Sequence, residues 1–599
     1  MKRKNGKSPA AGDRLAWWRD AKFGMFIHWG IYAVPAGIWK GKPVEGIGEW
    51  IAAYAQIPPG EYAQLAKKFN PRQFNADAWA KLAKDAGMKY MVFTAKHADG
   101  FAMYRSRHSG FNVVEATPYG RDIVAALAKA CRKAGLRFGV YYSQDQDLHE
   151  PDAGGYNLKG SLAESPEGFG QYTARKVVPQ VTELLTGYGP MDLFWFDNPI
   201  NTTPESAAML KRLVRGLQPQ AIVNGRIGYD LGDYKCLGDN QTSTGGVRGD
   251  WETCATMNDT WGYKKTDHNW KSVRTMLRAL VDITSKGGTY LLNVGPTGAG
   301  LIPGPSVARL RAVGRWLAVN GEAIYGASAS PFPYEFAWGR ATVRGNTLYL
   351  HIFDWPAEPF RLHGLKSRVR RVRLLGSPQA SLEFAAAHDP AAGTHTLEIK
   401  LPRRAPGRDV SVVAIETVGP VEVDQALRQQ PLGGIMLPAH AAEMHFAEYW
   451  GRMRIGQGGN LSDWYSADNR VAWHFKVSDP GEFDVLVVTK AVSMVGWLGG
   501  HRVEVAVAGC KLAKTLRATA AESDGAHLYP TFTNRIGTVK LEKAGDHTLA
   551  LSALKINPKA RGGLNLAAVW LVPKGTYVAG KKSGRAPAAK TKLLTAILA

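Results

Sequence analysis

Polar and aromatic side chains stand directly after short apolar runs in the first half of the chain. The run 23–27 is apolar and leads straight into His28, Trp29 and Gly30. Such a run is typical of a parallel strand that is buried on both faces. At its end, an imidazole could bind hydroxyl groups and an indole could pack against the face of a sugar ring. The pair therefore suggests a carbohydrate site.

The same pattern recurs along the chain. Apolar runs that end in polar residues lie at 90–97, 137–143, 193–197 and 221–226. The polar side chains at their ends are His97, Tyr142, Asp197 and Arg226. In a (β/α)8 barrel, strand ends of this kind meet at one face, where the chemistry takes place. We therefore expect a carboxylate, a guanidinium and several rings to share one pocket.

Helix-like segments separate these runs, at 78–86, 123–134 and 273–285. Strands that alternate with helices predict a parallel barrel. A run at 289–296 is the expected last strand, and 306–318 is the expected last helix. The predicted fold class is multidomain α/β plus all-β, with an N-terminal (β/α)8-type barrel.

Period-two alternation of apolar and polar residues replaces the helical pattern after residue 325 and predicts strands. Gly345-Asn346 fits the turn of a hairpin. The predicted domains are a flexible basic N-terminus (1–12), a catalytic barrel (13–325), a β-sandwich (326–418), a linker (419–432), a jelly-roll-like β-sandwich (433–573) and a basic disordered tail (574–599).

The last sandwich could be a carbohydrate-binding module. Aromatic residues that could stack on sugar there, although each also fits a core position, are Trp450, Trp464, Tyr465 and Trp497. The net charge of +24 favours anionic partners. Because no nucleic-acid recognition motif is found, an anionic polysaccharide fits this charge better than nucleic acid.

The composition predicts a soluble globular protein of several domains, without a membrane span. The basic start lacks the apolar stretch of a complete signal peptide. We expect a periplasmic or secreted protein if such a peptide has been trimmed, and a cytoplasmic one otherwise. The chain could form a homo-oligomer. The four cysteines, which show no metal-type spacing, are Cys131, Cys236, Cys254 and Cys510.

Longer motifs that combine aromatic and polar residues lie in order between residues 17 and 326. They are Trp17-Trp-Arg-Asp-Ala-Lys-Phe-Gly-Met-Phe-Ile-His-Trp-Gly30, Ala95-Lys-His-Ala-Asp-Gly-Phe101, Leu193-Phe-Trp-Phe-Asp197, Trp251-Glu-Thr-Cys254, Asn258-Asp-Thr-Trp-Gly-Tyr263, Leu291-Leu-Asn-Val-Gly-Pro296 and Asn320-Gly-Glu-Ala-Ile-Tyr-Gly326. Together they resemble the α-L-fucosidases of glycoside hydrolase family 29. The resemblance implies a retaining exo-glycosidase that removes terminal α-L-fucosyl residues and needs no metal or organic cofactor.

The resemblance also implies roles for particular residues. Asp197 matches the nucleophile of the family. For the acid/base, Asp239 in Gly238-Asp-Asn-Gln241 is favoured and Glu252 is the alternative, because the usual Glu is absent from this loop. The expected substrate-binding residues are His28, Trp29, Glu49, Trp50, His97, Tyr142, Trp195, Arg226 and Trp261.

One position departs from the family pattern. Ala98 stands where the family usually has a second His that binds a sugar hydroxyl. An alanine cannot replace that hydrogen bond, so unmodified fucose should bind less well unless another group compensates. A substituted substrate such as a sulfated fucan is therefore one hypothesis. The alternatives are an α-L-galactosidase-like variant and a non-catalytic sugar-binding protein on a retired barrel.

Overall fold

The computed structural model describes residues 13–150, 152–153, 166–356, 359–377, 381–390, 393–430, 434–446, 453–456, 458–491, 499–518, 521–522, 531–560 and 562–577. The chain divides into two compact units. The first unit comprises Met1–Gly238, Gly249–Met276 and Gly288–Ala318. The second unit comprises Asp239–Arg248, Leu277–Gly287 and Val319–Ala599.

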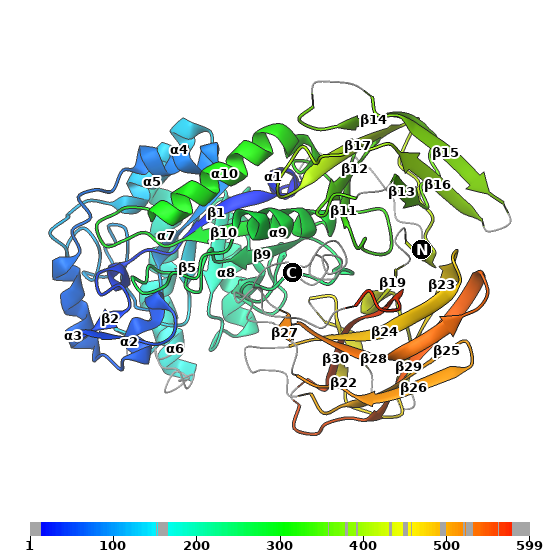
Figure 1. The fold of residues 1–599 in the computed structure, drawn as a ribbon. Coiled ribbons are helices and arrows are strands. Elements are labelled where there is room, and N and C mark those ends of the chain that lie inside the picture. Colours follow the sequence, from blue (N-terminus) through cyan, green and yellow to red (C-terminus); the bar gives the residue numbers. More distant parts are fainter. Residues whose placement is uncertain are drawn as a thin grey trace. The chain divides into compact units, whose positions relative to one another are not determined.

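Eight parallel strands form the centre of the first unit (Figure 1). In spatial order they are β7 (Ile222–Val223), β6 (Leu193–Asp197), β5 (Arg137–Ser143), β4 (Tyr90–Lys96), β1 (Phe23–Ile27), β10 (Thr289–Val294), β9 (Trp251–Ala255) and β8 (Lys235–Cys236). One parallel bridge between Asn224 and Tyr234 joins the two outer strands. β1, β4, β9 and β10 are buried along their whole length. The predicted N-terminal α/β barrel is therefore confirmed.

Helices follow β1, β4, β5, β6, β9 and β10 in the chain. They are α4 (Ala76–Asp85), α5 (Ile123–Ala134), α7 (Val178–Gly187), α8 (Pro204–Leu217), α9 (Val273–Ser285) and α10 (Gly304–Asn320). Local chemistry explains both ends of α5. The Asp122 side chain accepts the backbone N–H of Ala125 at the start of α5, and Gly135 ends that helix with a φ of 72°.

Shorter elements complete the first unit. They are α1 (Ala16–Ala21), η1 (Ile31–Ala33), the ribbon of β2 (Ile38–Trp39) and β3 (Lys42–Pro43), η2 (Gly48–Trp50), α2 (Ile51–Tyr54), α3 (Pro59–Ala63), η3 (Gln64–Lys68), α6 (Pro166–Tyr172), the π-helical turn η4 (Thr173–Val177) and η5 (Gly225–Ile227). Most of them lie in the segments that follow the strands, and these segments are where a barrel carries its functional groups.

The second unit consists largely of antiparallel sheets, and η6 (Gly321–Ala323) precedes them. One sheet has the order β11 (Gly339–Arg344), β12 (Thr347–Ile352), β17 (Ser411–Thr417), β14 (Val369–Leu374), and a second has β13 (Phe360–His363), β16 (Thr394–Ile399), β15 (Phe384–Asp389). β11 and β12 form the predicted hairpin, with Gly345 and Asn346 between them.

Two larger sheets follow. The first has the order β18 (Leu427–Arg428), β23 (Arg470–Val477), β29 (Gly545–Lys555), β25 (Arg502–Val507), β26 (Cys510–Thr515), with β20 (Glu443–His445) paired to β23. The second has the order β21 (Arg454–Ile455), β22 (Leu461–Trp464), β30 (Leu564–Pro573), β24 (Gly481–Lys490), β28 (Thr531–Leu541), β27 (Ala521–Glu522), with β19 (Ile435–Pro438) paired to β30 and η7 (Ala439–Ala441) after β19.

The expected linker 419–432 is structured in its described part. It contains β18, which pairs in parallel with β23, and residues 427–430 are buried. One apolar core cluster extends from Phe332 to Leu571 and includes residues of both predicted sandwiches. The two sandwiches of the second unit therefore share a hydrophobic core.

Several sequence-based expectations fall outside the described residues. These are the basic N-terminus 1–12, most of the tail 574–599, and the side chains of Trp450 and Trp497. Of the other two stacking candidates, Trp464 is fully buried and Tyr465 is 57% exposed. Among the described helices, none is long and apolar enough to cross a membrane.

Candidate active site

Asp197 is the last residue of β6 and lies between two hydrogen-bond donors. Its Oδ1 accepts from Nη1 of Arg226 at 3.1 Å, and its Oδ2 accepts from the hydroxyl of Tyr141 at 2.8 Å. Both donors stabilise the ionised form of the carboxyl group. The Asp197 side chain is 14% exposed. The carboxylate is therefore held by two donors and remains partly exposed.

The guanidinium of Arg226 is itself held in place. Arg226 lies in η5, directly after β7. Its guanidinium carbon lies 4.9 Å from the ring centre of Trp195. Its Nη2 contacts the backbone oxygen of Leu237 at 3.4 Å and the sulfur of Cys254 at 3.3 Å. Stacking restricts the planar guanidinium, so Arg226 presents a fixed positive charge to Asp197.

The tyrosine that contacts Asp197 is Tyr141, whereas Tyr142 is the tyrosine expected from the sequence. The hydroxyl of Tyr142 is buried and donates to Oε1 of Gln180 at 2.7 Å. Because successive side chains of a strand point to opposite faces, Tyr142 lies on the helix side of β5. The structure therefore does not bring Tyr142 together with Asp197. The register that pairs Tyr141 with Trp195 would have identified the correct face, but a single sequence does not show it.

Aromatic rings form a wall next to Tyr141. The imidazole of His97 stacks on Tyr141, with ring centres 5.3 Å apart and planes 7° from parallel. The ring centre of His28 lies 5.6 Å from that of His97 and 5.0 Å from that of Trp261. The ring of Trp50 stands nearly perpendicular to His97, at 6.5 Å and 89°. The structure therefore brings together four of the predicted substrate-binding residues.

The two histidines offer hydrogen-bonding groups of defined character. His28 shares a hydrogen bond of 2.8 Å between its Nδ1 and Oδ1 of Asn293, a residue that the sequence analysis does not single out. Burial, together with the nearby His28 and Lys96, lowers the pKa of His97 well below its usual value. His97 is therefore neutral at physiological pH. Its Nδ1 is buried and has no hydrogen-bond partner among the residues that the structure describes.

Trp29 lies apart from this group. Its ring is buried against Phe69, Phe74 and Trp79, with ring centres 5.0 to 5.4 Å away. Its Nε1 donates to the backbone oxygen of Thr297 at 3.0 Å. The contacts of Trp29 are thus those of a packing residue rather than of a substrate platform.

Glu49 is also buried and connects two loops. Its Oε2 accepts from the backbone N–H of Gly262 at 2.8 Å and lies 3.3 Å from the hydroxyl of Thr260. These bonds join η2, which carries Trp50, to the loop that carries Trp261. Glu49 therefore helps to position two of the rings that line the site.

Glu252 is fully buried inside the barrel. Its Oε1 accepts from Nε1 of Trp195 at 2.9 Å, and its Oε2 accepts from the hydroxyl of Tyr90 at 3.1 Å. Burial raises the pKa of Glu252 to about 7, although Trp195 and Tyr90 favour the charged form. Glu252 thus holds the indole of Trp195 in place, and the guanidinium of Arg226 stacks on that ring.

Replacing Glu252 by glutamine should therefore change stability more than catalytic selectivity. Because the folded-state pKa of Glu252 lies above the ordinary 4.5, the folded protein should lose stability as pH rises from about 4.5 to 7. The loss should reach about 3 kcal/mol by the size of the shift, and Glu252→Gln should remove most of it.

Thermal unfolding at a series of pH values measures this effect, with Glu45→Gln at an exposed site as the control. A pH dependence that persists unchanged in Glu252→Gln would contradict the assignment. Activity should fall by the same factor for good and poor leaving groups, because the glutamine does not alter proton donation to the substrate.

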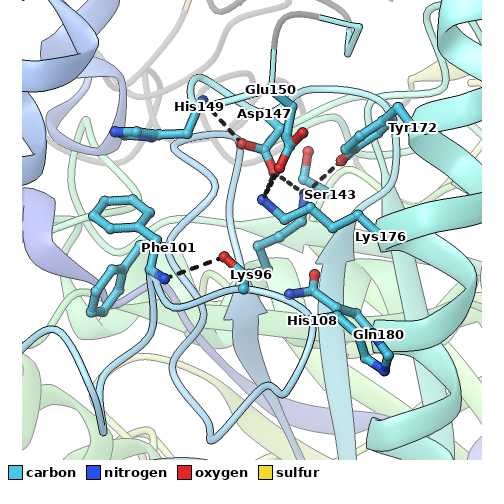
Figure 2. Close-up of polar contacts among 12 residues, drawn as sticks. Lys96, Phe101, His108, Ser143, Asp147, His149, Glu150, Tyr172, Lys176 and Gln180 are labelled. Atoms are coloured by element: carbon cyan, nitrogen blue, oxygen red, sulfur yellow. Dashed lines mark hydrogen bonds and ion pairs between the residues drawn. The ribbon is translucent and has the colours of Figure 1, made fainter.

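A buried ionic cluster supports the loop that carries His97 (Figure 2). The ammonium groups of Lys96 and Lys176 lie 3.2 and 2.9 Å from the same oxygen of Asp147. Burial by itself would raise the pKa of Asp147, but the two lysines outweigh it and lower the pKa to about 2. A Cβ atom on Gly100 would lie 2.1 Å from Oδ1 of Asp147, which leaves room only for glycine.

The cluster explains much of the motif 95–101, although nothing in the sequence marks Asp147 as its partner. The backbone N–H of Leu148 also donates to the oxygen of Ala98 at 3.1 Å. Ala98 itself is fully buried. The loops after β4 and β5 are therefore joined, and His97 is held between them.

Asp239 opens the loop 239–248 and belongs to the second unit. It is partly buried, and Asn240, which follows it, is buried. Among the described residues, no group of three or more His, Cys, Asp or Glu side chains is placed to hold a metal ion.

Comparison with known proteins extends these observations. The family model described as Alpha-L-fucosidase matches residues 3–322. The tissue α-L-fucosidase of Mus musculus is 33% identical over 369 residues, which cover 57% of this chain and 78% of that protein. The tissue α-L-fucosidase of Homo sapiens is 33% identical over 371 residues, which cover 57% of this chain and 76% of that protein.

Solved structures agree with this relationship. The α-L-fucosidase from Vibrio sp. strain EJY3 is 31% identical, covers 94% of this chain and 98% of its own, and superposes with a TM-score of 0.81. The α-L-fucosidase isoenzyme 1 from Paenibacillus thiaminolyticus is 33% identical, covers 68% of this chain and 99% of its own, and has a TM-score of 0.60. The likeness to the Vibrio structure therefore extends over both compact units.

Proposed function

The chain belongs to the α-L-fucosidase family, glycoside hydrolase family 29, and on that premise we propose that Asp197 is its catalytic nucleophile. The protein is a glycoside hydrolase that acts on α-L-fucosides, and its family retains the configuration of the anomeric carbon. Retention requires one carboxylate that attacks the sugar and one carboxyl group that protonates the leaving oxygen.

The contacts of Asp197 carry this proposal. A nucleophilic carboxylate must be ionised, oriented and accessible. The bonds from Arg226 and Tyr141 favour the ionised form and restrict the rotation of the carboxylate. Attack on the anomeric carbon would form a covalent fucosyl ester and invert that centre. A second displacement by water would invert it again and release α-L-fucose.

Asp239 is the acid/base in this proposal. It would protonate the glycosidic oxygen as the ester forms and then take a proton from the attacking water. The surroundings of Glu252 support the choice of Asp239. Both oxygens of Glu252 are engaged by Trp195 and Tyr90, and its side chain is fully buried, whereas Asp239 is partly exposed.

The aromatic wall would hold the sugar. In this proposal the imidazoles of His28 and His97 bind hydroxyl groups, and the rings of Trp50 and Trp261 pack against apolar parts of the fucosyl residue. Glu49 and Trp195 act through their neighbours, because their carboxylate and indole nitrogen are bound to protein groups.

Trapping the covalent intermediate tests the proposal. A fluorinated fucosyl donor slows both displacements, so that the ester accumulates and mass spectrometry of a digest locates it. The labelled peptide should contain Asp197. A label on any other carboxyl group would overturn the assignment.

An aryl α-L-galactoside, compared with the corresponding fucoside, measures the preference for the methyl group of fucose.

The finer identity of the substrate is a separate proposal, an oligosaccharide from a sulfated fucan. The net charge of +24 supports it, because a positive surface attracts an anionic substrate. Ala98 lacks the hydrogen-bonding group of the usual histidine, which lowers the advantage of unmodified fucose. Ala98 is fully buried, so a sulfate group would bind at a more exposed part of the site and not in contact with the Ala98 methyl group.

We expect a higher kcat/KM on sulfated oligosaccharides than on the same oligosaccharides after desulfation. The advantage should shrink as salt rises, because exposed charges are screened over about 8 Å at physiological ionic strength. Ala98→His should move the preference back toward neutral fucosides. Equal rates on the two substrates at low salt would exclude a sulfated substrate class without affecting the role of Asp197.

A further inference from the structure

The loop 239–248, here called the aspartate loop, belongs to the same compact unit as the C-terminal β-module, residues 434–577. Lys490, the last residue of β24, donates from Nζ to the backbone oxygen of Thr242 at 2.7 Å. The backbone N–H of Thr244 donates to the oxygen of Gly458 at 2.7 Å. Hydrogen bonds thus fix the loop a few residues after Asp239.

The contact between the aspartate loop and the module is also sterically close. A Cβ atom on Gly459, whose φ is +86°, would lie 1.7 Å from the backbone oxygen of Gly245. Cβ atoms on Gly245 and Gly246 would each lie 2.5 Å from the side chain of His440. Residues with side chains cannot replace these glycines unless the loop and the module move apart.

A third anchor comes from the charged end of α9. Lys286 donates from Nζ to the backbone oxygen of Ser243 at 2.7 Å. The same ammonium group lies 2.8 Å from Asp282 and 2.9 Å from Glu335, so its position is fixed. A cavity borders the loop at residues 242–244 and is also lined by Lys490 and Trp570. At residues 242–244, which border this cavity, hydrogen bonds hold the loop, and at Gly245 and Gly246 it is held by close packing against the module.

We propose that the C-terminal β-module is a positioning element of the catalytic machinery, and that Lys490 and the Gly458–Gly459 turn set the place of Asp239. The inference rests on the proposed role of Asp239 as acid/base. A general acid must lie within hydrogen-bond reach of the oxygen that it protonates, and a displacement of about 1 Å can cost on the order of 100-fold in rate. The module therefore acts on the chemical step and not only on glycan attachment.

Lys490→Met tests this role, because it keeps the length of the side chain and removes the donor. On an alkyl α-L-fucoside, a poor leaving group, kcat/KM should fall by about 10- to 100-fold. On a dinitrophenyl α-L-fucoside, which needs no protonation, it should fall by no more than about threefold. Equal losses on both substrates, or no loss on either, would overturn the inference.

Lys514→Met is the matched control in the same module. Lys514 also donates from Nζ to a backbone oxygen, that of Arg535 at 2.8 Å, and among the described residues no hydrogen bond joins it to the aspartate loop. Its replacement should leave the ratio of the two rates unchanged. A shift of the ratio in Lys514→Met as large as that in Lys490→Met would assign the effect to general loosening of the module and overturn the inference.

Gly459→Ala provides a second route if Lys490→Met fails to fold. The added methyl group should displace the aspartate loop and lower the rate on the alkyl fucoside selectively. Thermal melting establishes that the variant is folded. A folded Gly459→Ala with the rate ratio of the parent protein would refute the positioning role.

The inference and the proposed function fail in different ways. If Asp239→Ala shows no dependence on the leaving group, Asp239 is not the acid/base, whatever Lys490 does. If Asp239→Ala shows that dependence and folded Lys490→Met does not, only the role of the module is refuted. When both variants show the leaving-group dependence, the double variant should lose less kcat/KM on the alkyl fucoside than the two separate losses multiplied together. The reason is that Lys490 acts through Asp239.

Discussion

Replacing Asp197 by alanine is expected to abolish the hydrolysis of α-L-fucosides, with a loss of about 10⁴-fold or more in kcat. Without the carboxylate, no covalent fucosyl ester can form. Among the described side chains near Arg226 and Tyr141, Asp197 is the carboxylate that accepts from both. The measurement is the release of aryl alcohol from a dinitrophenyl α-L-fucoside.

Azide provides a stereochemical readout of the same variant. In the space left by the carboxylate, azide can attack the anomeric carbon in one displacement, so the product should be a β-L-fucosyl azide. Asp85→Ala, at the exposed end of α4, is a control for the substitution and should remain fully active. Near-parental turnover by folded Asp197→Ala would show that another group is the nucleophile.

The long buried strands could be predicted from the sequence because they are continuous apolar runs. The runs at 90–97 and 193–197 correspond to β4 and β6, and the segment 123–134 is α5. Two strands of the barrel were not anticipated. β8 has only two residues, and β9 contains Glu252, a carboxyl group at a position where an apolar residue is expected.

The candidate site was predictable in its residue types more than in its geometry. Asp197 ends β6 and Arg226 lies shortly after β7, so their convergence could be expected from barrel topology. The choice between Tyr141 and Tyr142 depends on which face of β5 points inward, and two adjacent tyrosines give no signal for that choice. Trp29 has the composition of a sugar platform, but it packs on distant aromatic residues whose proximity the sequence does not reveal.

The contacts of the aspartate loop depend on segments far apart in the chain. Thr242 and Lys490 are separated by 248 positions, and Thr244 and Gly458 by 214. Gly245 and Gly459 could be recognised in the sequence as turn residues, but not as each other's neighbours. The sequence predicts a possible carbohydrate-binding module, and the contacts of this module with the loop of Asp239 support the additional positioning role proposed above.

The second large effect is expected for Asp239→Ala, and it should depend on the leaving group. An alkyl α-L-fucoside needs protonation of its oxygen as the bond breaks, so its kcat/KM should fall by about 10²- to 10⁴-fold. A dinitrophenyl fucoside leaves as a stable anion, so formation of the fucosyl ester should be nearly as fast as in the parent protein. Loss of the base should then slow hydrolysis of the ester, which accumulates.

Azide distinguishes the two aspartates by the configuration of the product. In Asp239→Ala, Asp197 still forms the fucosyl ester, and azide attacks that ester without needing a general base. Two inversions give an α-L-fucosyl azide, the opposite anomer from that expected with Asp197→Ala. Glu252→Gln should give neither the α- nor the β-L-fucosyl azide. The opposite result would be that azide speeds turnover by Glu252→Gln and gives the α-L-fucosyl azide, but does neither with Asp239→Ala. In that case the acid/base role belongs to Glu252.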